Sequence, residues 1–460
     1  MISSHQSARP LALLHLPNEM LEAIALCLET QRDIYALVRT NHQLHDALNS
    51  TLYRRNVDDS GGSALTWAVI HGREETAIKA INAGASGGEA LWRSVQNKDE
   101  KMAKLILSSG NADGNFRDSE QGETPLLAAV RLGDESMLKL LLSSGKVKLD
   151  SYTADNSSAL MLAIDKGHED IAKMLLDQDG VDVNHANWRG HRALSLAAAE
   201  GFLDVVKMLI GMENVVVDFR GRFDDYTPLA WACKKGHLSI VELLLDSGRV
   251  DPNPRTFQGC TPFMLASENG HSAVMRCLVD TGRIDVWERR NNGATAFSSA
   301  LDQGHLSALE LIMESIESTS VQRFVEVSRE TLTRAVYARS LPITKLLLDS
   351  GLIDINEVDS WGKTALHHAC RLHAEDIVAY LLQREDIDAN VQDDTGFTPL
   401  MVAAASSRGF RTVKIFLQSG KVDVALQNHD GATAISIARI RRRYHTRQLL
   451  ERWDRRSKGE

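Results

Sequence analysis

Four residues near position 370 belong to types that bind metals or act in catalysis: His367, His368, Cys370 and His373. Imidazole and thiolate groups are common zinc ligands, but a structural zinc site also needs a second ligand pair at a defined spacing, and none stands here. We therefore expect no metal site. Cys370 follows an alanine that recurs along the chain, so we expect it in the core.

A second chemical pattern is Gly362-Lys363-Thr364, which resembles the end of a phosphate-binding loop. That loop requires a glycine five positions earlier, where this chain has Glu357. The chain also lacks a Gly-x-Ser-x-Gly elbow and a His-Glu-x-x-His helix. These observations predict a protein without a catalytic site or a cofactor.

The elements around these residues repeat along most of the chain. Ten apolar residues, here called register residues, follow one another at steps of 34 or 35 positions: Leu126, Leu160, Leu194, Leu229, Phe263, Phe297, Leu332, Leu366, Leu400 and Ile435. Three positions after each stands an alanine, at 129, 163, 197, 232, 266, 300, 335, 369, 403 and 438. Such regularity indicates a repeat architecture.

Each unit shows the chemistry of two short helices. The alanine lets neighbouring helices approach closely, a glycine seven positions after most register residues can end the first helix at positive φ, and a leucine-rich run packs the second. The unit of Leu332 has Arg339 in place of that glycine. Stacked units bury a continuous apolar face that a single unit cannot bury.

The residues Thr-Pro-Leu-Leu-Ala-Ala at 124–129, Thr-Ala-Leu-His-His-Ala at 364–369 and repeated Gly-His pairs resemble the ankyrin consensus. The resemblance implies an all-α ankyrin-repeat solenoid over residues 58–452. Its helix pairs would be joined by β-hairpin loops in about twelve units, the first two registered on Leu65 and Leu91. In this family the consensus histidine, here His367, hydrogen-bonds within the hairpin and helix.

The N-terminal segment, residues 11–57, does not follow this register. Met20, Leu21 and Ile24 recur at helical spacing after Pro17, and further helices are expected at 33–39 and 41–53. Three helices of this length bury too little apolar surface to be stable alone, because such small domains are marginal without a partner. We expect something to cover the remaining face.

The same segment, with Leu-Pro-x-Glu-x-Leu-x-x-Ile followed by Asp-Ile-x-x-Leu, resembles the fungal type of F-box. The resemblance implies a three-helix domain that docks on the Skp subunit of an SCF ubiquitin ligase. The contacts it implies are Leu16, Pro17, Met20, Leu21, Ile24 and Leu37. The alternative is an N-terminal cap that covers the first, shortened repeat.

Resemblance to ankyrin proteins also implies where a target protein would bind, namely the hairpin tips and the concave face of the inner helices. The tip residues are Trp188, Arg189, Phe223, Asp224, Phe257 and Trp361, and the concave-face residues are Arg131, Lys166, Glu200, Lys234 and Lys235. Exposed aromatic side chains are favoured anchors at interfaces. Trp188, Phe223 and Phe257 lie on three consecutive units and would either stand side by side or fold onto adjacent hairpins.

Composition and the two ends of the chain limit the remaining functions. The formal net charge is -9 with both signs interleaved, which favours protein partners over nucleic acid, and the five cysteines include no closely spaced pair. We expect a disordered start at 1–10, no signal peptide or membrane span, and a cytoplasmic or nuclear monomer apart from its partners. The basic C-terminus from Arg439 to Lys458, whose last part is a tail at 453–460, is either a nuclear signal or a charged capping helix.

Together these patterns predict a substrate-recognition adaptor of an SCF-type ubiquitin ligase, in which an F-box docks on Skp and ankyrin repeats hold an unknown target protein. The alternative is a non-catalytic scaffold or inhibitor that binds a protein without ubiquitination.

Overall fold

The computed structural model describes residues 20–21, 42–60, 63–315 and 331–457. These residues contain 25 helices, and their only β structure consists of isolated bridges at Tyr152–Ser158, Arg289–Thr295 and Val358–Thr364. Each bridge closes a loop immediately before a helix. The described part of the chain is therefore built from short helices joined by hairpin-like loops. None of its helices is long and apolar enough to cross a membrane.

The chain divides into two compact units. Unit 1 comprises residues 1–216 and 221–223 and holds α3 to α13; unit 2 comprises residues 217–220 and 224–460 and holds α14 to α28. The helices of unit 1 are α3 His42–Ser60, α4 Ser63–Ile70, α5 Glu74–Asn82, α6 Gly88–Gln96, α7 Glu100–Ser108, α8 Pro125–Leu132, α9 Glu135–Ser143, α10 Ala159–Asp165, α11 Glu169–Leu176, α12 Ala193–Glu200 and α13 Leu203–Gly211.

The described helices of unit 2 continue the same alternation. They are α14 Pro228–Lys235, α15 Leu238–Asp246, α16 Pro262–Glu268, α17 Ser272–Asp280, α18 Ala296–Gln303, α19 Leu306–Glu314, α21 Thr331–Tyr337, α22 Leu341–Asp349, α23 Ala365–Leu372, α24 Glu375–Gln383, α25 Pro399–Ala405, α26 Phe410–Ser419, α27 Ala434–Ile440 and α28 Tyr444–Ser457.

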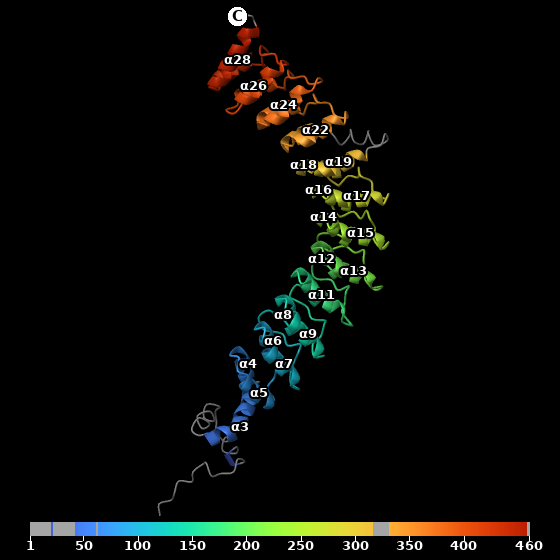
Figure 1. Cartoon of the computed structure of the whole chain (residues 1–460), viewed down its shortest axis with the longest axis vertical. Helices are drawn as coiled ribbons and strands as arrows, with labels where there is room; N and C mark the ends of the chain where they lie inside the picture. The colour runs from blue at the N-terminus through green and yellow to red at the C-terminus, as the bar shows by residue number, and fades with distance from the viewer. Residues whose placement is uncertain (1–19, 22–41, 61–62, 316–330, 458–460) are drawn as a thin grey trace, which may run out of the picture. The chain divides into compact units, whose positions relative to one another are not determined.

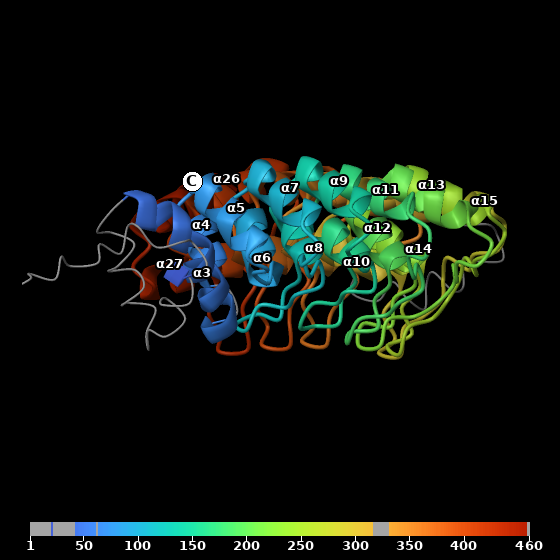
Figure 2. The ribbon, with the colours of Figure 1, turned by 90° about the horizontal axis from the view of Figure 1, so that it is seen from below.

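Within each unit the helices form antiparallel pairs that stack on their neighbours (Figure 1). We call the first helix of a pair the inner helix and the second the outer helix. In unit 1, Figure 2 shows the inner helices, such as α8 and α10, between the outer helices and a set of loops that project on the side away from the outer helices. The surface that the inner helices share with these loops is the inner face of each unit.

Most inner helices begin where the sequence places a hydroxyl residue before an apolar run, whereas α6 begins after Gly87 and α12 begins after Arg192. Thr124 precedes Pro125, and its side chain accepts a hydrogen bond from Leu127 N, while Thr227 does the same for Ala230 N. The hydroxyl oxygen satisfies a backbone N–H that has no partner inside the helix, and proline fits the first turn because it lacks an N–H. The Thr-Pro pairs therefore set the start of the repeats that contain them, such as those of α8 and α14.

Most inner helices end at a left-handed residue seven positions after the register residue, as predicted; α25 is an exception, because its C-cap residue Ser406 has φ of -77°. Gly133, Gly201, Gly236 and Gly304 have φ between 67° and 85°. The backbone keeps this conformation where glycine is missing, because Lys98, Arg339, His373 and Arg442 have φ of 52° to 58°. The fold thus imposes the left-handed turn even on residues that carry a Cβ.

The apolar core follows the sequence register. All ten alanines that follow the register residues are fully buried, and nine of the ten register residues are buried, the exception being the half-buried Ile435. A larger side chain in place of these alanines would push neighbouring helices apart, because protein interiors are close-packed. The prediction that alanine sets the spacing between stacked helices is consistent with this burial.

Asparagine side chains join the bases of neighbouring loops. In unit 1, Asn184 donates to Asn214 O at 2.7 Å and accepts from Val216 N at 2.8 Å. In unit 2, Asn390 makes the same pair of bonds to Lys421 O and Asp423 N. These bonds satisfy backbone groups that no strand pairs, so the loops stand at a fixed spacing.

Two helix boundaries differ from the sequence prediction. Helix α3 continues to Ser60 rather than ending at Tyr53, because no glycine or proline interrupts the chain before Gly61. Helix α28 continues to Ser457, past residue 452, where a tail was expected. Leu450 and Thr446 of α28 are buried, and Arg447 pairs with Glu451, so the basic end forms a regular helix packed on α26 and α27.

Candidate protein-binding surface

Two aromatic side chains stand on neighbouring loop tips of unit 1. Trp188 is 62% exposed and Phe223 is 73% exposed. Arg222 N donates to Arg189 O at 2.9 Å, which joins the two tips, and Arg189 itself is exposed. The Trp188 indole N–H also donates to Ala154 O of the preceding loop at 3.2 Å. Trp188 therefore rests against an adjacent loop and still presents most of its surface.

The exposed tip aromatics of unit 2 are Phe257, at 74%, and Trp361, at 63%. Phe257 belongs to a different unit from Trp188 and Phe223, and its neighbour in unit 2 is the next tip, where Asn291 donates to Phe257 O at 2.7 Å. Of the expected row of three, the structure establishes Trp188 and Phe223 as neighbours. Asp224 is half-buried and its carboxylate accepts from Tyr226 N.

The pattern Gly362-Lys363-Thr364 forms one of these loop turns. Gly362 has φ of 69°, and the Asp359 carboxylate accepts hydrogen bonds from Trp361 N and Lys363 N, each at 2.9 Å. An aspartate that binds the backbone two and four residues later stabilises a tight turn. The likeness to a phosphate-binding loop is therefore a feature of the hairpin, as predicted.

On the inner face of unit 1, Arg131 is held by a bidentate ion pair. Its Nε lies 2.8 Å from Glu123 Oε1 and its Nη2 lies 3.1 Å from Glu123 Oε2, while Nη2 also donates to Gln96 Oε1. The hydrogen bond to Glu123 raises the pKa of Arg131. Arg131 thus joins neighbouring repeats. Lys166 pairs only with the adjacent Asp165 at 3.1 Å, and Glu200 is exposed.

On the inner face of unit 2, Lys234 is held by two aromatic rings. Its Nζ lies 4.9 Å from the centroid of the Tyr226 ring and 5.2 Å from that of Trp231, and the two rings meet edge to face at 5.1 Å. A cation over aromatic faces contributes about 0.5–2 kcal/mol. The neighbouring Lys235 is exposed to solvent.

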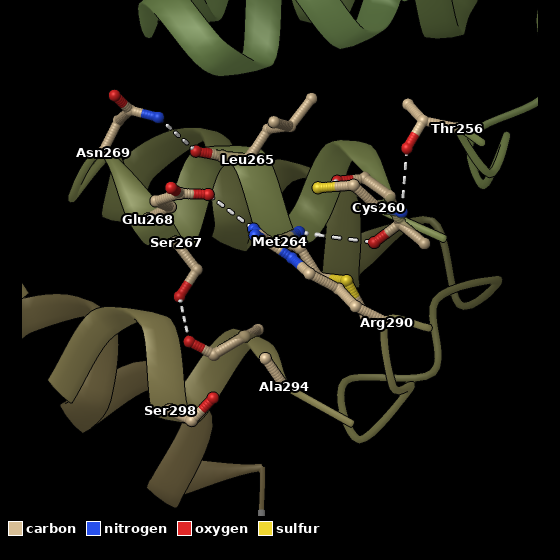
Figure 3. A network of polar contacts seen from close by, with 12 residues as sticks. Thr256, Cys260, Met264, Leu265, Ser267, Glu268, Asn269, Arg290, Ala294 and Ser298 are labelled. Carbon is tan, nitrogen blue, oxygen red and sulfur yellow. Dashed lines mark hydrogen bonds and ion pairs between the residues drawn. The ribbon is translucent and has the colours of Figure 1, made fainter. Parts of the chain in front are cut away.

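The next repeats of unit 2 carry two ion pairs, each between adjacent repeats. Arg290, from the loop before α18, reaches the end of α16 and donates from Nη2 to Glu268 Oε2 at 2.5 Å, as Figure 3 shows. Arg334 of α21 binds both carboxylate oxygens of Asp302 of α18. Sequence reasoning did not select Arg290 or Arg334, because it searched only the two positions before the glycine.

A chain of polar side chains follows on α21 and α23. His368 Nε2 lies 2.7 Å from Asp359 Oδ2, His368 Nδ1 lies 3.1 Å from the Tyr337 hydroxyl, and Arg371 donates to that hydroxyl. Burial lowers the pKa of His368 despite the nearby carboxylate. Burial alone would raise the pKa of Asp359, but hydrogen bonds from Lys363 N, Trp361 N and His368 lower it.

The remaining members of the histidine and cysteine cluster have separate roles. His367 Nδ1 is bonded at the Thr364 cap and its Nε2 meets Phe397 O of the next loop at 2.9 Å, whereas His373 forms the left-handed helix end. Cys370 is fully buried, and burial raises the pKa of its thiol, as it does for Cys233. Such thiols stay protonated and are poor nucleophiles.

Of the six residues assigned to Skp contact, the structure describes two. Met20 is 52% exposed, whereas Leu21 is buried at 4%. Met20 is therefore accessible to a partner, and the side chain of Leu21 is already covered. Leu16, Pro17, Ile24 and Leu37 lie outside the described residues.

Comparison with known families agrees with this geometry. A family model of ankyrin repeats in three copies matches residues 91–187, 179–256, 249–323 and 317–393, and a single-repeat model matches residues 395–429. Together these matches cover well over half of the 460 residues. The chain belongs to the ankyrin repeat family. Repeats of this family act in protein–protein interaction, and the exposed tips and polar inner faces are the surfaces that this ankyrin repeat protein offers.

Individual relatives match parts of the repeat array. A protein of Rickettsia bellii named as an ankyrin repeat protein is 30% identical over 128 residues, which is 28% of this chain and 68% of that protein. Neurogenic locus notch homolog protein 1 of Mus musculus is 39% identical over 83 residues, and its human counterpart is 37% identical over 83 residues. This ankyrin repeat protein matches only 3% of the length of either notch homolog.

Proposed function

We propose that this ankyrin repeat protein is the substrate-recognition adaptor of an SCF-type ubiquitin ligase. Residues 11–57 dock on the Skp subunit, and the repeats bind a target protein through their loop tips and inner faces. The observation that carries the Skp interaction is the F-box-like pattern that begins at Leu16-Pro17 and continues through Met20. The exposed Met20 side chain supports an open surface at this position.

In this proposal the protein itself performs no chemistry. It acts by holding the target beside the ubiquitin-conjugating enzyme that the ligase assembles, which raises the effective concentration of target lysines. The aromatic tips supply large, rigid contact areas, and the ion pairs of the inner faces supply a polar pattern that a complementary partner can match. The protein works in the cytoplasm or nucleus as a monomer apart from its partners.

A second candidate function is supported by the packing of α3. This helix lies against α4 and α5 of the first repeat, with Leu48 and Thr51 buried. A helix that covers the end of a repeat array is a cap, and terminal repeats need one to stay soluble. If the N-terminal segment serves only as a cap, the protein is a non-catalytic scaffold or inhibitor that binds its partner without ubiquitination.

Binding of purified Skp to the full-length chain separates these two functions. The adaptor proposal expects saturable binding by isothermal titration calorimetry, lost in the triple variant Leu16→Ala, Pro17→Ala, Met20→Ala. A matched control, Trp188→Ala with Phe257→Ala, changes loop tips and leaves Skp affinity unchanged. No Skp binding by the wild-type chain, or equal binding by the triple variant, favours the scaffold. Deleting residues 1–57 is a poorer design because it removes most of α3, which covers the first repeat.

A further inference from the structure

A cavity of about 450 Å³ opens on the inner face of unit 2. It lies between the loop at residues 289–294, the inner helix α18 and the side chain of Arg334 on α21. Pockets that bind small ligands typically enclose about 300–1,000 Å³, so this cavity is large enough for a side chain of a bound peptide. Its lining includes Glu268, Arg290, Asn292, Ser299, Asp302 and Arg334.

Two ion pairs line the cavity. Arg290 pairs with Glu268, and Arg334 pairs with Asp302. Asp302 uses both oxygens on Arg334, and Arg334 Nη2 also donates to Ser298 O at 3.3 Å. Both oxygens of Asp302 are therefore paired with Arg334, and Glu268 is the carboxylate that pairs with Arg290.

Arg290 has a hydrogen-bond donor that no acceptor in the described part of the chain satisfies. Its side chain is 15% exposed, and within the described residues its one hydrogen bond runs from Nη2 to Glu268 Oε2. The buried Nε has no acceptor. A buried guanidinium N–H without an acceptor is costly, because its interaction with water is lost and not replaced. Figure 3 shows the guanidinium lying between the loop and the end of α16, where Glu268 meets one edge of it.

Neutral groups of the lining can also donate hydrogen bonds to an anion. Asn292 Oδ1 already accepts from Ala294 N, which leaves its amide N–H₂ pointing away from that bond. Ser299 and Gln303 add a hydroxyl and a second amide to the same wall. A cationic ligand would have to displace Arg290 or Arg334 from its carboxylate, whereas an anion would meet spare donors. Charge-assisted hydrogen bonds from arginine to a carboxylate are among the strongest in proteins.

We propose that this cavity binds an acidic side chain of a peptide segment of the target protein, with Arg290 as the anion-binding residue. The inference rests on the proposed target-binding role of the repeats. Glu268 acts as an internal competitor, because its carboxylate occupies the Nη2 donor of Arg290 and its negative charge repels a second carboxylate beside the same guanidinium. The net charge of the whole chain is -9, so binding of an acidic peptide requires a local site such as this one.

The test uses the full-length chain and a fluorescein-labelled peptide of four Gly-Glu repeats, followed by fluorescence anisotropy. The proposal expects saturable binding of this probe and none of the matched Gly-Gln and Gly-Lys peptides. Arg290→Met weakens the Gly-Glu affinity about tenfold, because one charge-assisted contact is lost. A Gly-phosphoserine peptide, run in parallel, shows whether a carboxylate or a phosphate is the better anion.

A gain of affinity in Glu268→Gln separates ligand binding from a structural role of the ion pair. This variant removes the internal competitor, so the Gly-Glu peptide binds more tightly, an effect that loss of stability cannot produce. Arg276→Met is the matched control, because Arg276 pairs with Glu314 at 3.1 Å on exposed outer helices outside the cavity. Its affinity stays at the wild-type value.

Several outcomes overturn the proposal: no binding of the Gly-Glu peptide, equal binding of the Gly-Lys peptide, Arg290→Met matching Arg276→Met, or unchanged affinity in Glu268→Gln. None of these results depends on Skp. If acidic peptides bind the cavity but the chain fails to bind Skp, the ligase role fails and the peptide site stands; the reverse result removes only the peptide site.

Discussion

The inner faces of the two units have the same backbone and different chemistry. In unit 1 the position two residues after the register residue carries Trp67 and Arg93 in the first two repeats and the aliphatic Ala128, Leu162 and Leu196 in the next three. In unit 2 the same position carries Trp231, Leu265, Ser299, Arg334 and His368, followed by Val402 and Ile437. Arg93 of unit 1 pairs with Glu89 of its own helix, whereas in unit 2 Arg334 pairs with Asp302 of another helix and His368 with Asp359 of a loop.

This difference teaches that the repeat fixes where a side chain lies and leaves open what it does. The Thr cap, the buried alanine and the left-handed helix end recur in both units and set the frame. The side chains two residues after the register residue differ from repeat to repeat, and in unit 2 they add charged groups to the inner face. Function in such folds depends on sites added to a common scaffold, so unit 2 is the better place to look for a polar ligand.

The largest expected effect comes from the helix-ending glycines. Gly236 of unit 2 and Gly167 of unit 1 both have positive φ, but a Cβ at 236 would lie 2.5 Å from His271 Nδ1, while one at 167 meets nothing within 4 Å. Left-handed strain alone costs about 1–2 kcal/mol, and displacing a packed ring adds about 1–3 kcal/mol. Urea unfolding should show Gly236→Ala losing about 3 kcal/mol and Gly167→Ala about 1 kcal/mol. Equal losses would mean that the His271 ring moves aside without cost.

Acidification should destabilise unit 2 through His367 and His368. Burial lowers the pKa of both below the ordinary 6.5, so the unfolded chain takes up these protons first. The stability they contribute is present above about pH 6.5 and is lost as the pH falls below it. The thermal midpoint should therefore fall between pH 7.5 and 5.5, and the double variant His367→Gln, His368→Gln should show a smaller fall. If the thermal midpoint of the double variant falls as much as that of the wild type, other groups are responsible for the pH dependence.

Smaller effects should follow from adding glycine where the helix end lacks it. Lys98 of unit 1 is an exposed left-handed residue, so Lys98→Gly should stabilise the protein by about 0.5–1 kcal/mol. Arg339 of unit 2 has the same conformation but donates from Nη2 to Leu372 O at 2.7 Å. Arg339→Gly loses that bond, so its gain should be smaller. Chemical denaturation of both variants checks the order, and a larger gain at 339 would contradict it.

The smallest effect on stability is expected at the loop tips. Trp361→Ala removes a side chain that is 63% exposed, so the free energy of unfolding should change by less than about 0.5 kcal/mol. Trp188→Ala should cost slightly more, because the indole N–H loses its bond to Ala154 O. Thermal unfolding measures both. A loss above about 2 kcal/mol at either site would identify the side chain as a packing residue.

Much of the scaffold could be predicted from residue spacing because period and chemistry agree. The register residues, the alanines and the glycines identify the helix pairs, and their burial and φ values follow that pattern. The end of α3 was placed too early, at Tyr53, although the chain has no glycine or proline before Gly61 that would end the helix there.

The site was harder to predict. Arg290 comes from a loop and pairs with Glu268 of the previous repeat, 22 positions earlier. No local sequence pattern indicates this contact. The Asp359–His368–Tyr337 chain likewise joins a loop and two helices. Arg334 and His368 could have been found by following one fixed position of the register through every repeat. The tip aromatics could be selected from the sequence because a large ring at an exposed turn does not stabilise the turn, which indicates a role in binding.

The most direct test of the whole account is affinity purification of the full-length chain from cells, with the bound proteins identified by mass spectrometry. Three baits are compared: wild type, the Leu16→Ala, Pro17→Ala, Met20→Ala variant, and Arg290→Met. We expect Skp and cullin with wild type and Arg290→Met but not with the triple variant, and target proteins with the triple variant but depleted with Arg290→Met. Absence of Skp and cullin from the wild-type sample, or their retention by the triple variant, would contradict the account.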